Sequence, residues 1–103
     1  MAVGSIVKTK RVYYRGMLRV METRLRRPED DIRSDIELFQ QLESTGSGET
    51  LRFWERPDPA VIIGRSGVPS SEVRCEVCRS DNVPILRRSS GGGAVVVGRG
   101  CLN

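Results

Sequence analysis

The chain contains no histidine, and both of its lysines, Lys8 and Lys10, lie near the N-terminus. Without histidine, a histidine-based catalytic triad and a mixed Cys/His zinc site are excluded. Aromatic residues make up only 5% of the 103 residues, which is too few for a platform on which nucleic-acid bases stack. No apolar run approaches the roughly 20 residues of a membrane-spanning helix. We therefore expect a water-soluble protein with neither a membrane nor a nucleic acid as partner.

The net charge of +4 is unevenly distributed along the chain. Residues 1–27 carry a net charge of +7, whereas residues 28–103 carry −3, so the folded part is not a basic module. We interpret residues 1–27 as a basic N-terminal extension that is disordered, or whose start is miscalled, with Met17 or Met21 as the genuine start. A transit peptide is a second interpretation, because the segment is rich in arginine and poor in acids. A third is a basic arm that binds nucleic acid or anionic lipid.

The three cysteines, Cys75, Cys78 and Cys101, are an odd number in a chain without a secretion signal, which argues against a disulfide framework. Cys75 and Cys78 form a C-x-x-C pattern. A zinc ion would need two further ligands, and only one other cysteine is present. A redox motif would normally follow a strand directly at a helix start. We therefore expect two unrelated helical cysteines and no metal site.

Hydrophobic periodicity and turn residues predict two helices and four strands. Pro28 and three following acids are typical of a helix start, and Ile32, Ile36 and Phe39 share one helical face. The predicted helices cover residues 28–42 and 69–81, and the predicted strands cover residues 50–55, 60–65, 83–88 and 92–98. The first two strands are separated by a short proline-rich turn, which predicts an antiparallel hairpin. The order α-β-β-α-β-β indicates an α+β fold with a mostly antiparallel sheet and helices on one face.

Residues 87–100, "RRSSGGGAVVVGRG", hold five of the eleven glycines. Consecutive glycines leave backbone N–H groups bare, so that a carboxylate or phosphate can approach the main chain. The adjacent Arg87 and Arg88 could supply cationic forks for such a group, and Ser90 a hydroxyl. The alternative is a flexible hairpin loop whose glycines only permit positive φ. Composition alone does not decide between the two. The spacing matches neither a P-loop nor a dinucleotide-binding fingerprint.

The strings "LRFWERPDPAVIIGRS" and "EVRCEVCRSDNVPILRRSSGGGAVVVGRGCLN" resemble the start of the lipoate–protein ligase catalytic domain, in the biotin/lipoate ligase and octanoyltransferase superfamily. The RRxSGGGAV string is the most specific element. The resemblance implies that residues 28–103 form the N-terminal part of such a domain. It also implies a loop that closes over lipoate or octanoate and over its acyl-adenylate, lined by Arg88, Ser90, Gly91, Gly92, Gly93, Ala94 and Val95. Trp54 matches a family tryptophan that packs on the far end of the acyl chain, although a core aromatic would look the same.

The resemblance also implies what lies outside this stretch. The family's acyl-handling lysine is downstream of the matched segment, and residues 28–103 contain no lysine, so we identify no catalytic residue here. We expect a truncated ligase or transferase that is inactive alone. The alternative is a non-catalytic remnant, or a small acyl-binding or scaffold protein that acts with a separate C-terminal half.

Substrates, partners and location are likewise implied only by the resemblance. It implies lipoate or octanoate as substrate, with ATP and Mg²⁺ for adenylation. The implied acceptor is the lipoyl carrier domain of a 2-oxo acid dehydrogenase or of a glycine-cleavage protein. The implied location is the cytoplasm, or the mitochondrion in a eukaryote.

Overall fold

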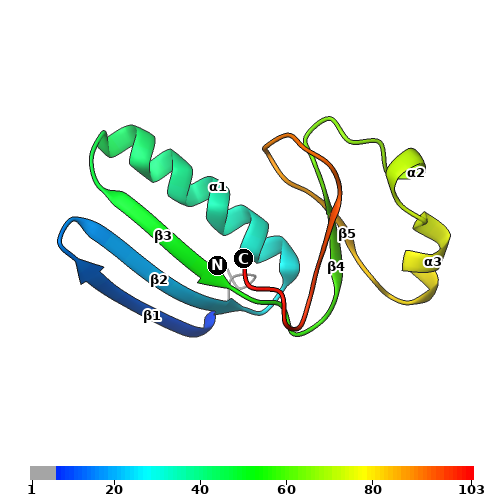
Figure 1. Ribbon diagram of the computed structural model, residues 1–103, viewed down its shortest axis with the longest axis horizontal. Helices are drawn as coiled ribbons and strands as arrows, with labels where there is room; N and C mark the ends of the chain where they lie inside the picture. Colours follow the sequence, from blue (N-terminus) through cyan, green and yellow to red (C-terminus); the bar gives the residue numbers. More distant parts are fainter. Residues whose placement is uncertain (1–6) are drawn as a thin grey trace, which may run out of the picture. The chain divides into compact units, whose positions relative to one another are not determined.

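The computed structural model describes residues 7–103, with side chains from Arg11 onward. The described residues form two compact units, each with its own three-stranded sheet (Figure 1). The first unit contains the residues up to Glu55 together with Leu102 and Asn103, and the second is Arg56–Cys101. The predicted α+β class is confirmed, but two strands precede the predicted elements, so the order is β-β-α-β-β-α-α-β-β.

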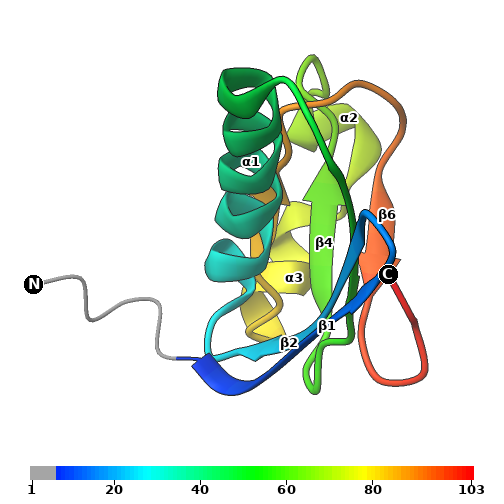
Figure 2. The same ribbon diagram turned by 90° about the vertical axis from the view of Figure 1, so that its left-hand side faces the viewer.

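The first unit is a sheet with one helix on one face. Strands β1 (Val7–Arg15) and β2 (Leu18–Leu25) form an antiparallel hairpin, and β3 (Glu49–Trp54) pairs with β2 in parallel. A parallel pair needs a crossover connection. Helix α1 (Pro28–Thr45) supplies it and lies along the sheet in Figures 1 and 2.

The prediction that residues 1–27 are disordered is wrong for the part that the structure describes. Residues 7–25 form β1 and β2, and the apolar side chains of β2 are buried, namely Val20, Met21 and Leu25. A strand of a helix-covered sheet can carry many arginines, because only its covered face must be apolar. Residues 1–6 of the predicted extension lie outside the described residues.

Helix α1 starts as predicted and ends one turn later. Pro28 occupies one of its first positions, and three acids fill its first turn. Gly46 ends the helix in the left-handed conformation, with φ 66°, and its N–H donates to the Leu42 carbonyl at 3.0 Å. Glycine is favoured there because a side chain would destabilise this backbone conformation.

The face that α1 buries differs from the predicted one. Phe39 is 63% exposed, and Ile32 and Ile36 are only half-buried. The fully buried residues of α1 are instead Asp30 and Asp31 in its first turn. Burial of a carboxylate requires a partner charge, because desolvation alone is costly.

Arg52 on β3 is the partner charge of Asp31. Its guanidinium forms an ion pair with Asp31, donates to Asp35 Oδ1 at 2.9 Å, and donates through Nε to Thr23 Oγ1 at 2.9 Å. The Arg52 side chain is only 3% exposed and lies 5.3 Å from the centre of the Trp54 ring. One buried side chain therefore connects β2, β3 and α1.

The second unit is built around one fully buried strand. Strand β4 (Ala60–Ile63) lies between β5 (Ile85–Arg87), with which it is parallel, and β6 (Val95–Val97), with which it is antiparallel. Every residue of β4 is buried, as its β-branched run predicts. Helices α2 (Pro69–Glu72) and α3 (Cys75–Ser80) connect β4 to β5.

Two predictions about these elements are wrong, and a third, the mostly antiparallel pairing, is only partly confirmed. The strands predicted to form a hairpin, β3 and β4, lie in different sheets. The single helix predicted over residues 69–81 is divided into α2 and α3, because Val73 adopts an extended backbone conformation with φ −132° and ψ 140°. Of the four strand pairings described, two are parallel, so the sheets are mixed rather than mostly antiparallel. No described helix combines the length and apolar character that crossing a membrane requires.

We expect Arg52→Ala to lower the free energy of unfolding by about 3–5 kcal/mol, because it leaves the buried Asp31 carboxylate without its guanidinium. Arg11→Ala is the matched control. Arg11 pairs with Glu22 at 3.6 Å but its side chain is 74% exposed, so the loss should stay below about 1 kcal/mol. Urea denaturation followed by circular dichroism measures both. Equal, small losses would show that the Arg52 network does not stabilise the fold.

Candidate functional site

The predicted loop connects β5 to β6 across the end of β4. Strands β4 and β5 are parallel, so both carboxyl ends lie at one edge of the sheet, and the loop starts there. We call residues 88–94 the glycine loop. In open sheets that contain parallel strands, ligands commonly bind at this edge. The loop residues from Ser89 to Ala94 are exposed, so their main chain is accessible to solvent.

Arg88, the first residue of the glycine loop, fixes the loop through hydrogen bonds of its side chain. Its Nη2 donates to the carbonyl oxygens of Gly91 and Gly93, both at 2.9 Å. Its Nη1 reaches the Ile62 carbonyl of β4 at 3.3 Å, and its own backbone N–H donates to the Ile63 carbonyl at 3.0 Å. The side chain predicted to be a fork for a ligand thus uses three hydrogen bonds to fix the loop against β4.

Arg87 fixes the segment on the other side of the site. Its Nη1 donates to three carbonyl oxygens in the turn after β4, those of Gly64, Arg65 and Gly67, at 3.1, 2.9 and 2.9 Å. Charge-assisted bonds of this kind are stronger than neutral ones. Both arginines therefore have a structural role that the sequence did not indicate, while their positive charges stay beside the loop.

The turn after β4 and the glycine loop touch backbone to backbone. The Arg65 N–H donates to the Ser90 carbonyl at 2.8 Å. A Cβ added to Gly64 would collide with the Gly92 carbonyl oxygen and would lie 3.2 Å from the Gly92 nitrogen. Glycine at position 64 is therefore required for the loop to lie where it does.

The three consecutive glycines are not equivalent. Gly92 has a φ of 108°, which disfavours any side chain, and a Cβ there would lie 2.8 Å from Arg88 Nη2. Gly91 and Gly93 have ordinary backbone angles, and a Cβ on either would meet no atom within 4 Å. The fold of this chain therefore requires glycine at the middle position but not at the two outer ones.

The remaining predicted residues are at the ends of strands. Val95 begins β6 and is 49% exposed, and it follows the exposed Ala94. Trp54 ends β3, is only 8% exposed, and belongs to the first unit, whereas the glycine loop belongs to the second. The Trp54 backbone exchanges hydrogen bonds with Asn103 at 3.0 and 2.9 Å. Trp54 is thus a core aromatic of the first unit.

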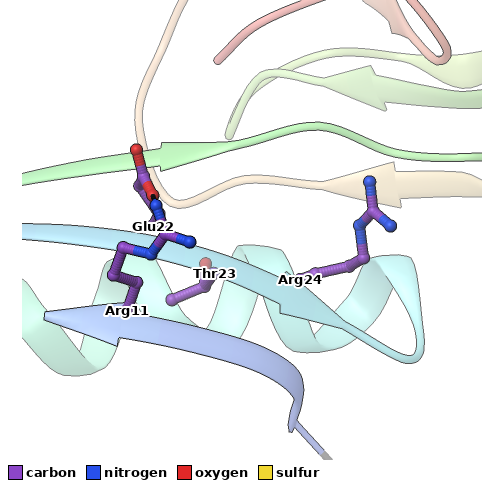
Figure 3. A pocket seen from close by; sticks show the side chains of 4 residues that line it. All are labelled: Arg11, Glu22, Thr23 and Arg24. Atoms are coloured by element: carbon purple, nitrogen blue, oxygen red, sulfur yellow. Dashed lines mark ion pairs between the residues drawn. The ribbon is translucent and has the colours of Figure 1, made fainter.

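Two cavities in the first unit were not predicted from the sequence. One, of about 270 Å³, is lined by Arg11, Glu22, Thr23 and Arg24 (Figure 3). The Arg11 and Glu22 side chains that border it form an ion pair at 3.6 Å. The other, of about 250 Å³, lies where the tip of the β1–β2 hairpin meets the end of α1 and the start of β3. Neither cavity contains a predicted site residue. Within the described residues, no three acidic or cysteine side chains gather as a metal site would need.

The glycine loop and the strands beside it fall within a recognised catalytic domain. Residues 27–103 match the family described as the lipoyl protein ligase A/B catalytic domain. The chain belongs to this family. The family assignment predicted from the RRxSGGGAV string is thus confirmed.

Relatives with known names agree with the family. A candidate lipoate-protein ligase A of Aeropyrum pernix is 42% identical over 52 residues, which is 50% of this chain and 19% of that protein. The mitochondrial lipoyl amidotransferase LIPT1 of Mus musculus is 38% identical over 56 residues, 54% of this chain and 15% of that protein. The chain thus spans less than a fifth of the length of these two relatives.

A solved structure is similar in fold as well as in sequence. It is that of a candidate lipoate protein ligase from T. acidophilum with bound lipoic acid. The TM-score is 0.52 at 38% identity, and the match covers 55% of this chain and 23% of that one. At this identity the similarity supports kinship within the lipoyl ligase family and not only a shared arrangement of strands.

We expect Gly64→Ala to displace the glycine loop, because the new methyl group collides with the Gly92 carbonyl oxygen. Overpacking of this kind costs about 1–3 kcal/mol of unfolding free energy. The Arg65 amide, which donates to Ser90, should exchange with deuterium faster. Gly91→Ala is the control, since its methyl group enters open space and should change stability by no more than about 0.5 kcal/mol. Equal behaviour of the two variants would contradict the close approach.

Proposed function

We propose that this chain supplies the acyl- and acyl-adenylate-binding loop of a lipoate–protein ligase-like catalytic domain. The observation that carries the proposal is the pair of outer glycines, Gly91 and Gly93. The fold does not require glycine at either position, yet both side chains are absent. A ligand that lies against the exposed main chain would require that neither position carries a side chain.

Charge and hydrogen-bonding capacity support an anionic ligand. Arg87 and Arg88 keep two positive charges fixed beside the loop, because backbone carbonyls hold their guanidinium groups in place. Bare backbone N–H groups of consecutive glycines are suited to a carboxylate or phosphate oxygen. We infer that the loop N–H groups, rather than the arginine forks, contact the carboxyl or phosphoryl oxygens, and that Ser90 contributes its hydroxyl at the rim.

The apolar part of the substrate would lie on apolar side chains. Ala94 and Val95 continue directly from the glycines and are exposed. Trp54 remains a proposed contact for the far end of the acyl chain. We infer lipoate or octanoate as the acyl group, since a saturated chain that ends in a carboxyl group fits an apolar strand beside an anion-binding loop.

The complete reaction would need groups beyond this loop. A lysine would have to stabilise the anionic carboxyl and phosphate groups, and residues 28–103 contain none. We therefore propose that the chain acts with a C-terminal part of the catalytic domain and that the acceptor is a lysine of a lipoyl carrier domain. ATP with Mg²⁺ would activate the acyl group in a ligase. The proposed location is the cytoplasm or the mitochondrion.

A non-catalytic role is the second proposal. The hydrogen bonds of Arg87 and Arg88 favour it, because their described guanidinium donors bond to backbone carbonyl oxygens. The chain would then bind an acyl ligand or support a partner without taking part in transfer. Binding and transfer assays distinguish these two proposals.

The binding proposal predicts that Gly93→Val weakens the affinity for lipoate or lipoyl-adenylate at least tenfold while the free energy of unfolding changes little. The side chain would enter the space of the ligand but no space of the protein. Gly92→Val should also abolish binding, with a cost in stability because of its positive φ. Val77→Ala, an exposed position on α3, is the control. Isothermal calorimetry measures affinity, and an unchanged affinity of Gly93→Val would contradict the proposal.

The transfer proposal predicts no lipoylation of a carrier domain by this chain alone with lipoate and ATP. Adding the C-terminal part of a relative's catalytic domain should produce lipoylation, detected as a mass increase of the acceptor. Transfer by the chain alone would show that another group replaces the lysine. Binding without transfer, even in the mixture, would support the non-catalytic role.

A further inference from the structure

The proposed function leaves a pair of thiols on α3 without a role. Cys75 and Cys78 are the first and fourth residues of this six-residue helix. Positions three residues apart lie on the same face of a helix. Both cysteines are free thiols and both are half-buried, so that they are partly open to solvent. The structure therefore places two partly exposed thiols on one face of α3.

On a regular helix the Cβ atoms of these two cysteines lie slightly farther apart than a disulfide allows. Side chains three apart have Cβ atoms about 5–6 Å from one another, whereas a disulfide requires about 3.5–4.5 Å. Closure therefore needs a small movement of one end of α3. The residues before Cys75 allow it, because Val73 is extended and Arg74, with φ −78° and ψ 81°, is not helical. A bond formed by distorting a helix is easily reduced again.

We propose that Cys75 and Cys78 form a redox-active dithiol that exchanges with small disulfides, either linear or cyclic. One thiolate attacks a sulfur of the small disulfide, whose S–S bond breaks, and the departing thiolate takes up the proton that the cysteine lost. The second cysteine then attacks the mixed disulfide at the protein sulfur. A Cys75–Cys78 bond forms, and the small molecule leaves as its second thiol. The cysteines are oxidised by two electrons and the small disulfide is reduced by two.

Cys101 provides an internal comparison. It is also a half-buried thiol of the second unit that forms no disulfide, but it has no other cysteine within three residues of the sequence. Accessibility alone would make all three thiols react alike. A dithiol site would make the pair react differently, since only the pair can complete the second exchange.

The folded chain is incubated in two separate arms, one with oxidised glutathione as a linear disulfide and one with lipoic acid as a cyclic one. Free thiols are then blocked with N-ethylmaleimide, and the chain is digested with trypsin. Cleavage after Arg74 and Arg79 releases residues 75–79 with both cysteines in one peptide. We expect this peptide to lose two hydrogens at least tenfold faster than Cys101 is modified, in one arm or in both.

Single cysteine-to-serine variants test whether the oxidation depends on Cys75 and Cys78 together. Cys101→Ser should form the Cys75–Cys78 bond at the unchanged rate. In the glutathione arm Cys75→Ser and Cys78→Ser should each stop at a mixed disulfide with the small thiol. The proposal is overturned if neither probe oxidises the pair, if Cys101 reacts as fast as the pair, or if oxidation links Cys101 to either cysteine.

Discussion

The contact between the Gly64 position and the Gly92 carbonyl oxygen fixes the geometry of the candidate site. Because Gly64 follows the buried strand β4 directly, the core of the second unit positions the loop, together with the hydrogen bonds of the Arg88 side chain. The hydrogen bond from Arg65 to Ser90 lies beside this contact. The position of the loop thus depends on the absence of one methyl group. Residues 89–94 can stay exposed to solvent and still be held in one conformation.

The two arginines that precede the glycines show how positive charge can serve a site indirectly. Arg87 donates to carbonyl oxygens in the turn after β4, and Arg88 donates to carbonyl oxygens within the loop. A lysine could not replace Arg88, because a single ammonium group lacks the planar fork with which Nη1 and Nη2 reach β4 and the loop at once. The guanidinium groups remain charged, so they still favour an anion nearby. The hydrogen bonds of both guanidinium groups, however, hold the backbone that would contact that anion.

Much of the fold could be predicted from local patterns. The start of α1 followed from Pro28 and the acids after it, and β4 followed from its β-branched run. Strands β1 and β2 were missed because their arginines suggested a disordered segment, whereas the burial of Val20 and Met21 depends on tertiary packing that no local pattern shows. The pairing of strands was also missed, since the turn between β3 and β4 allows a hairpin but does not require one.

Part of the candidate site could likewise be predicted from the sequence, and part of it could not. The glycine loop and its family were predictable from one string of residues. The hydrogen bonds of Arg88 and the approach of Gly64 were not, because they join positions far apart in the sequence. The buried ion pair of Arg52 with Asp31 could not be predicted for the same reason. Nothing in the local sequence distinguishes a charged residue that will be buried from one that will face water.

The backbone pairing of Trp54 with Asn103 makes the second unit an insertion within the first. The chain leaves the β3 sheet after Trp54 and returns to it 49 residues later, where Asn103 also donates through its side chain to the Trp54 carbonyl. Closing a flexible loop of that length costs entropy that grows with the logarithm of its length. A second unit that is already folded shortens the effective loop, so the two hydrogen bonds form at a lower entropic cost.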